Sequence, residues 1–151
     1  MRIAPHIDLT IAYFRHGTKA PDGDRLFREF SRPVISPVLL SSLAYGGLKD
    51  IARIPAIQAA KGNWDWMLWA EHTGVDFEDL QLGDAVDTDD IAIHGAMARM
   101  GMALMPSFLT RREIEAGSLV ELPGAKPVET GQYFILASPM SAVRPSACET
   151  G

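Results

Sequence analysis

The fold class is decided by the stretch Thr88-Asp89-Asp90-Ile91-Ala92-Ile93-His94-Gly95-Ala96-Met97-Ala98-Arg99-Met100-Gly101-Met102-Ala103-Leu104-Met105-Pro106. Its first half has apolar residues at the spacing of one helix face: Ile93, Ala96, Met97 and Met100. Thr88 is a candidate N-cap, and the two aspartates after it suit a helix N-terminus. Gly101 can take the left-handed conformation that ends a helix, and the apolar run before Pro106 predicts a buried strand. A helix that leads into a buried strand is typical of α/β proteins.

Working outward, the chain reads as alternating strands and helices. Alternation from Ile7 to Tyr13 predicts a half-buried strand. A second extended segment, Leu26 to Ile35, contains Pro33, which indicates a sheet edge or a crossing between lobes. Turns or loops are expected at Phe14 to Gly23 and Ser107 to Leu109. Helices are expected at Pro37 to Ser42, Leu48 to Arg53 and Arg111 to Ala116. A further helix is expected to begin at Trp64 and to end at Gly74. Asn63 would cap this helix, which should be buried on most sides. Further strands are expected at Pro55 to Ala59, Leu80 to Val86, Leu119 to Leu122, and Tyr133 to Ala137, the last covered on both faces.

Composition narrows the class of protein. The net charge of −5 argues against a nucleic-acid-binding domain, which usually has a basic face, so we expect no direct DNA binding by this chain. A single cysteine, Cys148, cannot form an internal disulfide, which favours a cytoplasmic location. No apolar run is long enough to span a membrane, and the N-terminus does not resemble a signal peptide.

Recognisable catalytic and metal-binding motifs are absent from the sequence. The four histidines are dispersed, and there is no Gly-x-Ser-x-Gly elbow, Walker loop or dinucleotide fingerprint. We therefore predict no catalytic residue, no metal and no cofactor. Eight acidic residues and no Lys or Arg lie between Glu71 and Asp90, which predicts a solvated acidic surface. The alternative is a cation site that would use Asp84, Asp87, Asp89 and Asp90.

Five segments occur in the order known from one family: "DLTIAY" from Asp8, "RPVISPVLL" from Arg32, "WDWMLWAEHTGV" from Trp64, the opening stretch, and "EIEAGSLVEL" from Glu113. Together they resemble the effector-binding domain of LysR-type transcriptional regulators, in the subgroup of the glycine-cleavage activator. The resemblance implies a two-lobed α/β fold of the periplasmic-binding-protein type 2 class, whose second lobe is Rossmann-like.

The same resemblance implies boundaries. Residues 1–36 and 131–139 would form a partial first lobe, residues 37–122 the second lobe, residues 123–130 a linker, and residues 140–151 a disordered tail. The first lobe would be incomplete, because the strand, helix and strand that open it in the family have no counterpart here. The family's winged helix-turn-helix has no counterpart either.

A ligand site is expected where strands end and helices begin, because helix N-termini present free N–H groups there. The opening stretch supplies Thr88, Asp89 and Pro106, Ser107 follows it directly, and Ser36 lies at the expected crossing between the lobes. From the resemblance, residues after the first strand would form the opposite wall of a cleft between the lobes: Tyr13, Phe14 and Arg15. Phe14 and Ala12 depart from the residues usual in the subgroup, Gly and Arg.

We interpret the chain as a small-metabolite-binding effector domain whose ligand is an organic acid or amino acid. The alternative from another class is a small hydrolase, similar to an esterase or lactonase, that uses the same cleft through Ser107 or His16. A third interpretation is a non-functional relic. Because the incomplete lobe would leave strand edges and apolar faces exposed, we also expect self-association.

Overall fold

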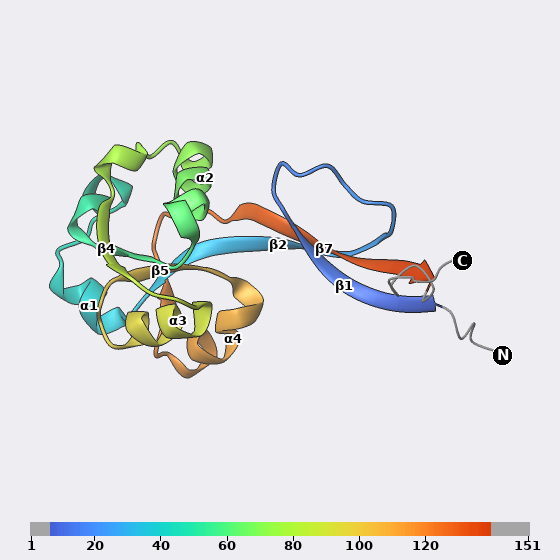
Figure 1. Cartoon of the computed structure of the whole chain (residues 1–151). Coiled ribbons are helices and arrows are strands. Elements are labelled where there is room, and N and C mark those ends of the chain that lie inside the picture. Colours follow the sequence, from blue (N-terminus) through green and yellow to red (C-terminus); the bar gives the residue numbers. More distant parts are fainter. Residues whose placement is uncertain (1–6, 140–151) are drawn as a thin grey trace. The chain divides into compact units, whose positions relative to one another are not determined.

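The computed structural model describes residues 7–139 and divides into two compact units. Unit 1 comprises Met1–Glu29 with Gly131–Gly151, and unit 2 comprises Phe30–Thr130. The predictions for the tail at 140–151, including Cys148, lie outside the described residues. Two long strands, residues 24–35 and 128–139, each contribute residues to both units (Figure 1).

Unit 1 is built from three strands: β1 (Ile7–Arg15), the first part of β2 (Asp24–Ile35) and the last part of β7 (Val128–Pro139). β7 lies between β1 and β2. β1 pairs with β7 in antiparallel register, with Ile11 opposite Ile135. The predicted strands are therefore confirmed in type, although β1 and β7 are longer than expected.

The burial expected from the sequence patterns of these two strands is not observed, whereas the exposed apolar faces expected there are observed. Leu9 and Ile11 were expected on the covered face of β1, but they are 72% and 66% exposed. β7 was expected to be covered on both faces, yet of Tyr133 to Ala137 only Phe134 is buried. The reason is that the described residues of unit 1 contain no helix to pack on either face of the sheet.

Unit 2 is a mixed α/β layer structure with strand order β2-β5-β3-β4. The strands β3 (Pro55–Gln58), β4 (Gln81–Ala85) and β5 (Met102–Pro106) are mutually parallel, whereas β2 is antiparallel to β5. The short strand β6 (Val120–Glu121) pairs with β2. Pro33 therefore lies in an interior strand, opposite Leu104, and not at a sheet edge. Its carbonyl accepts a hydrogen bond from Leu122 N–H at 3.0 Å, a bond that needs no N–H from proline.

Helices cover both faces of this sheet (Figure 1). α2 (Trp64–Thr73) packs on one face, together with α1 (Pro37–Ser42) and the 3₁₀ helix η1 (Leu48–Arg53). α3 (Asp89–Met97) and α4 (Ser107–Ala116) pack on the other. Two 3₁₀ turns complete the unit, η2 (Lys61–Asn63) and η3 (Phe77–Asp79).

The helix that opens the deciding stretch ends earlier than predicted. Its last residue is Met97, after which Ala98 caps it and Arg99 takes a positive φ of 69°. Met100, expected on the buried face, is 38% exposed. Gly101 does not end the helix. Glycine is needed at this position because the backbone passes close to β3, where a Cβ would collide with the carbonyl of Pro55.

Two other boundaries differ from prediction. The expected turn at 107–109 is the first turn of α4, because Pro106 has φ −63° and ψ 141° and occupies the N-cap position. The linker predicted at 123–130 is shorter, since β7 begins at Val128, and Val128 and Thr130 are buried.

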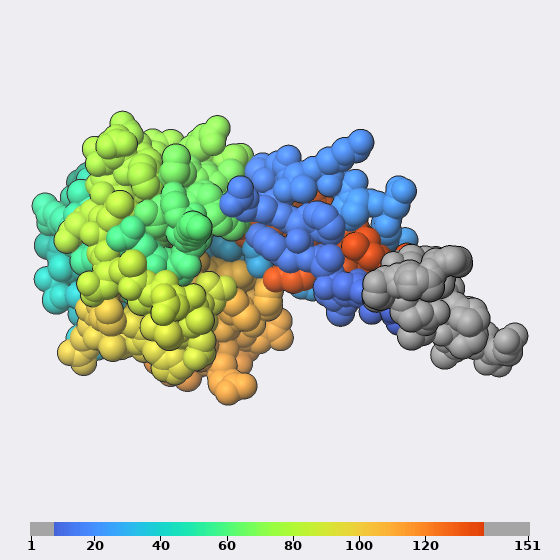
Figure 2. Space-filling model, in the orientation of Figure 1, coloured from blue at the N-terminus to red at the C-terminus, as the bar shows by residue number. Residues whose placement is uncertain are grey.

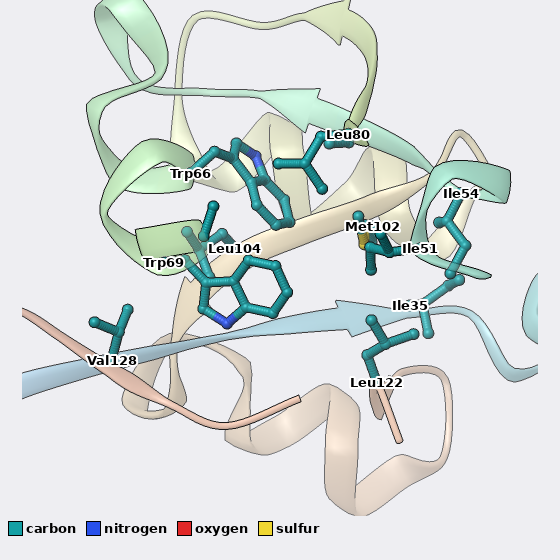
Figure 3. Close-up of a cluster of buried hydrophobic side chains, with 12 residues drawn as sticks. Ile35, Ile51, Ile54, Trp66, Trp69, Leu80, Met102, Leu104, Leu122 and Val128 are labelled. Atoms are coloured by element: carbon teal, nitrogen blue, oxygen red, sulfur yellow. The ribbon is translucent and has the colours of Figure 1, made fainter. Parts of the chain in front are cut away.

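The larger hydrophobic core of unit 2 centres on two tryptophans of α2 (Figure 3). Trp66 and Trp69 are 1% and 0% exposed and meet edge to face, with ring centroids 5.7 Å apart. Each indole N–H donates to a backbone carbonyl at 3.0 Å, to Ile57 and Lys126 respectively. α2 is not buried on most sides as predicted, since Met67 is 50% exposed.

Within residues 7–139, no helix has both the length and the apolar composition needed to cross a membrane.

Candidate functional site

Three helices begin at one edge of the unit 2 sheet. α2 follows β3, α3 follows β4 and α4 follows β5 along the chain. Since these strands are parallel, their carboxyl ends lie at the same edge, and so do the N-termini of the helices that follow. Free backbone N–H groups at helix N-termini commonly bind ligands at such an edge.

The start of α3 is formed as predicted. The Thr88 hydroxyl accepts a hydrogen bond from Ile91 N–H at 3.2 Å and caps the helix. Asp89 and Asp90 follow in the first turn, where the helix dipole favours negative charge. Both residues are exposed, but partial burial of the Asp89 carboxyl raises its pKa, and the Asp90 side chain is 83% exposed.

The start of α2 departs from prediction. Asn63 occupies the N-cap position in a left-handed conformation, φ 56°, but its side chain does not cap the helix. Its Nδ2 instead donates to Gln58 Oε1 at 2.9 Å, and Gln58 Nε2 donates to the Gly83 carbonyl at 2.7 Å. Because that carbonyl can only accept, both amide orientations are fixed. Asn63 Oδ1 is left buried and without a donor.

Asp65 lies in the first turn of α2 and is only 8% exposed. Its carboxylate accepts Trp66 N–H at 2.7 Å. Burial, and to a smaller extent the negative charge of Asp89, raises the pKa of Asp65 to about 6, although backbone hydrogen bonds act in the opposite direction. The first turns of α2 and α3 therefore each carry an aspartate with a raised pKa, of which Asp65 is buried and Asp89 is exposed.

A pocket of about 330 Å³ lies at this edge, between the loop after β3 and the loop after β4. It is lined by Gln58, Ala59, Ala60, Lys61, Gly62, Asn63, Ala85, Val86 and Asp87. In Figure 2 the surfaces of α2 (green) and α3 (yellow-green) share one face of unit 2. A pocket of about 540 Å³ lined by Lys49, Thr73 and Asp79 lies at the opposite edge. α2 ends there, so that pocket has no free helix N–H groups from α2.

The start of α4 has no side-chain cap. Pro106 is buried and ends β5, and Ser107 is exposed at the first helical position. Ser31 of β2 lies opposite Pro106, and its hydroxyl forms a 2.9 Å hydrogen bond with that of Thr130. The start of α4 is therefore a helix N-terminus without a side-chain cap, a kind of position at which anions commonly bind.

Ser36 does not join this edge. Its hydroxyl accepts from Val38 and Leu39 N–H at 3.2 and 3.4 Å, which caps α1. Ile35 lies opposite Met102, at the amino end of β5, so Ser36 is at the other end of the sheet from Ser107. The chain passes between units at Glu29 and Phe30, and the polar residue that follows that crossing is Ser31.

The three predicted residues of unit 1 lie at the carboxyl end of β1, but they do not share a face. Tyr13 is 39% exposed and donates from its hydroxyl to Glu29 Oε1 at 3.1 Å, while its ring is 5.1 Å from that of Tyr133. Phe14 packs edge to face on Phe134. Arg15 is exposed at the end of the strand. Burial, followed by the negative charge of Glu29, raises the pKa of Tyr13.

Metal binding finds no support in residues 7–139. No group of three or more His, Cys, Asp or Glu side chains there is arranged to hold a metal ion. The alternative of a cation site at the four aspartates Asp84, Asp87, Asp89 and Asp90 is therefore not supported.

Sequence reasoning missed Gln58, Asn63 and Asp65 as members of the edge. A signal was present, because Asn63 directly precedes a helix that follows a strand, as Thr88 does. What could not be predicted was the burial of Asp65, which depends on the packing of α2 on the sheet.

Several solved structures share this fold. The effector domain of the regulator AmpR of Pseudomonas aeruginosa matches with a TM-score of 0.66 and 22% identity, over 95% of this chain and 65% of that one. The regulatory domain of HypT from Salmonella typhimurium matches with a TM-score of 0.61 and 20% identity, over 85% and 62% of the two chains. CrgA of Neisseria meningitidis, described as a LysR-type transcriptional regulator, matches through its regulatory domain with a TM-score of 0.61 and 17% identity, over 82% and 64%. The fold is that of LysR-type effector-binding domains.

A sequence relative points to the same class. The chain is 27% identical, over 120 residues, to the glycine cleavage system transcriptional activator of Escherichia coli strain K12. The match covers 79% of this chain and 39% of that protein, so the chain corresponds to less than half of the length of its relative. No family model matches the chain.

These matches confirm the resemblance to the LysR-type effector-binding domain, with distant similarity to the glycine-cleavage activator. The proteins named here are regulators and not enzymes, which favours the regulator interpretation over the hydrolase.

Proposed function

We propose that the chain binds a small metabolite as the effector-binding domain of a LysR-type transcriptional regulator, in the cytoplasm and without turnover. The observation that carries the proposal is the common edge of the unit 2 sheet, where α2, α3 and α4 all begin. Three helix N-termini at one edge supply oriented N–H donors for an organic acid or an amino acid. DNA contacts are not assigned to this chain.

The proposed contacts at this edge are Thr88, Asp89, Pro106 and Ser107, with Ser31 in place of Ser36. The carboxylate of the metabolite is assigned to the first turn of α4, because that turn has no side-chain cap and Ser107 is exposed. Tyr13, Phe14 and Arg15 remain proposed contacts from unit 1.

The test is a binding screen of small carboxylic acids and amino acids, read by tryptophan fluorescence and by the melting temperature. Ser107→Asp is the informative variant, because it places a carboxylate at the first turn of α4. The dipole favours that charge, so the fold should persist, while an anionic ligand should be repelled. Ser118→Asp, exposed beyond the other end of α4, is the control. The proposal fails if no compound of these classes binds, or if both variants bind as the unmodified protein does.

Self-association through unit 1 is a second part of the proposal. β1 is an edge strand, and its exposed side chains include Leu9 and Ile11. Edge strands with apolar faces promote pairing with another chain. Light scattering after size exclusion should show a species larger than a monomer, and Ile11→Lys should reduce it. Met67→Lys, at a 50% exposed position of α2, should leave it unchanged. A monomer at all concentrations would contradict this part alone.

A further inference from the structure

The two strands at the ends of the sheet order, β1 and β4, differ in how their open edges are protected. β4 has only five residues, it contains Gly83 and the exposed Asp84, and its register with β3 is interrupted. Short length, charge and irregular pairing are features by which proteins keep an edge strand from pairing with another chain. β1 has nine residues without Pro, Gly or Lys, its charged residues Asp8 and Arg15 lie near its ends, and its register with β7 is unbroken. The edge of β1 is therefore open to a further strand.

One face of β1 also presents apolar side chains beside this edge. Leu9, Ile11 and Tyr13 alternate along the strand and are 72%, 66% and 39% exposed. The Tyr13 side chain is held in place, because its hydroxyl donates to Glu29 Oε1 at 3.1 Å and its ring lies against the backbone of Gly131 on β7. The surface that a partner strand would meet is thus apolar, and its aromatic member is already fixed.

The geometry of a strand edge limits how two copies of β1 can pair. Alternate residues of a strand direct their N–H and C=O groups to the same edge, so opposite residues must both be odd-numbered or both be even-numbered. In antiparallel pairing of identical strands, one residue then lies opposite its own copy, at a two-fold axis. β1 runs from Ile7 to Arg15 and its middle residue is Ile11, so the pairing centred on Ile11 is the one that matches the whole strand.

This pairing is complementary in side chains and in charge. Leu9 of one copy lies opposite Tyr13 of the other, and aliphatic–aromatic cross-strand pairs of this kind stabilise sheets. The apolar face of one copy continues into that of the next. Asp8 and Arg15 lie at opposite ends of β1, so antiparallel pairing keeps like charges apart, whereas parallel pairing would bring the like charges of the two copies together.

We infer that a second copy of this chain covers the edge of β1, in antiparallel pairing with a two-fold axis at Ile11. The inference rests on the self-association proposed above, and it names the partner strand and the register. Both copies use the same surface in a two-fold contact, so the contact closes on itself. The product is a dimer in which β1, β7 and the first part of β2 from each copy form one sheet, with no larger species.

Disulfide cross-linking of the full chain tests the register. Cys148 is the single cysteine of the sequence, so every variant also carries Cys148→Ser. Opposite residues of antiparallel strands have Cα atoms about 4.5–5.5 Å apart, a separation that suits a disulfide. Under mild oxidation Ile11→Cys should form a covalent dimer about tenfold or more faster than Leu82→Cys, because pairing raises the effective concentration of the thiols. Leu82 is 43% exposed on β4 and provides the matched control.

Two neighbouring positions check the register. Thr10 of one copy lies opposite Ala12 of the other, so a mixture of Thr10→Cys and Ala12→Cys should cross-link. Each of these variants alone should not, because its two Cα atoms would be about 8 Å apart, beyond the reach of a disulfide. The melting temperature of each reduced variant verifies that it is folded.

Light scattering separates this inference from the proposed function. If the chain associates but Ile11→Cys reacts no faster than Leu82→Cys, the pairing of β1 is wrong while self-association stands. Cross-linking of Thr10→Cys or Ala12→Cys alone would overturn the register, and a species larger than a dimer would overturn the two-fold closure. A monomer at all concentrations would overturn both this inference and the self-association, and it would leave metabolite binding unaffected.

Discussion

Units 1 and 2 are built from the same kinds of residues but differ in how much of their apolar surface is covered. In unit 2 helices pack on both faces of the sheet, and all five residues of β5 are buried. In unit 1 the sheet has three strands and no helix in its described residues, and Leu9 and Ile11 are more than half exposed. A strand contributes stability in proportion to the apolar area that it removes from water. Apolar side chains therefore stabilise the strands of unit 2 more than those of unit 1.

Hydrogen exchange gives the most direct measurement of this difference. Amides of β5 should open only with global unfolding, whereas amides of β1 should exchange through local opening. The expected gap in opening free energy is on the order of 4 kcal/mol, given typical domain stabilities. Equal protection of Ile7–Arg15 and Met102–Pro106 in a monomer would show that unit 1 is covered in a way that the described residues do not reveal.

Trp69→Ala should cause the largest loss of stability among single substitutions in unit 2. The side chain is fully buried and its indole N–H donates to Lys126, so about 3–5 kcal/mol of unfolding free energy should be lost. Met67→Ala, two residues earlier and 50% exposed, should cost less than about 1 kcal/mol. Denaturant titration followed by circular dichroism measures both, and similar losses would contradict the assignment of the core.

The buried carboxyl of Asp65 predicts a pH dependence of stability. Its pKa in the fold, about 6, lies above its ordinary value of 3.8, so the folded state binds more protons between these two pH values. Stability should therefore fall as the pH rises from about 4 to about 6 and then level off. Asp65→Asn should remove this slope and raise the unfolding free energy at neutral pH by up to about 3 kcal/mol.

A matched control is Asp90→Asn, whose exposed side chain should leave the slope intact. A wild-type curve without the slope between pH 4 and 6, measured by denaturant titration at several pH values, would show that the Asp65 carboxyl is not desolvated.

A single hydroxyl in each unit sharpens the comparison further. Tyr13 donates to Glu29 in unit 1, and Tyr45 donates to the Pro123 carbonyl at 2.7 Å in unit 2. Each Tyr→Phe substitution should cost about 1 kcal/mol. In exchange experiments Tyr13→Phe should accelerate amide exchange in β1 and β7 near Tyr13 and Tyr133 and leave exchange in β5 unchanged. Faster exchange in β5 would contradict the separation of the two units.

Local chemistry in the sequence predicted most of the elements of unit 2. Thr88 caps α3, Ser36 caps α1 and Gly117 ends α4 in a left-handed conformation, because these signals depend only on neighbouring residues. The apolar run of β5 likewise predicted a buried strand, and all five of its residues are buried. The Thr88–Asp89 and Pro106–Ser107 positions of the candidate site followed from the same reasoning, since each is a junction between a strand and a helix.

The remaining features depend on contacts between distant residues. Gly101 was interpreted as a helix stop, but it is needed because Pro55 of β3 passes against it. The sequence predicts that Asn63 caps a helix, yet its side-chain amide binds Gln58. The orientation of the Gln58 amide is set in turn by the carbonyl of Gly83 on the neighbouring strand. The exposure of Leu9 and the burial of Asp65 are decided in the same way. The alternation of a strand, or a position in the first turn of a helix, determines where a side chain points. Only the elements that pack around the side chain determine whether it stays in contact with water.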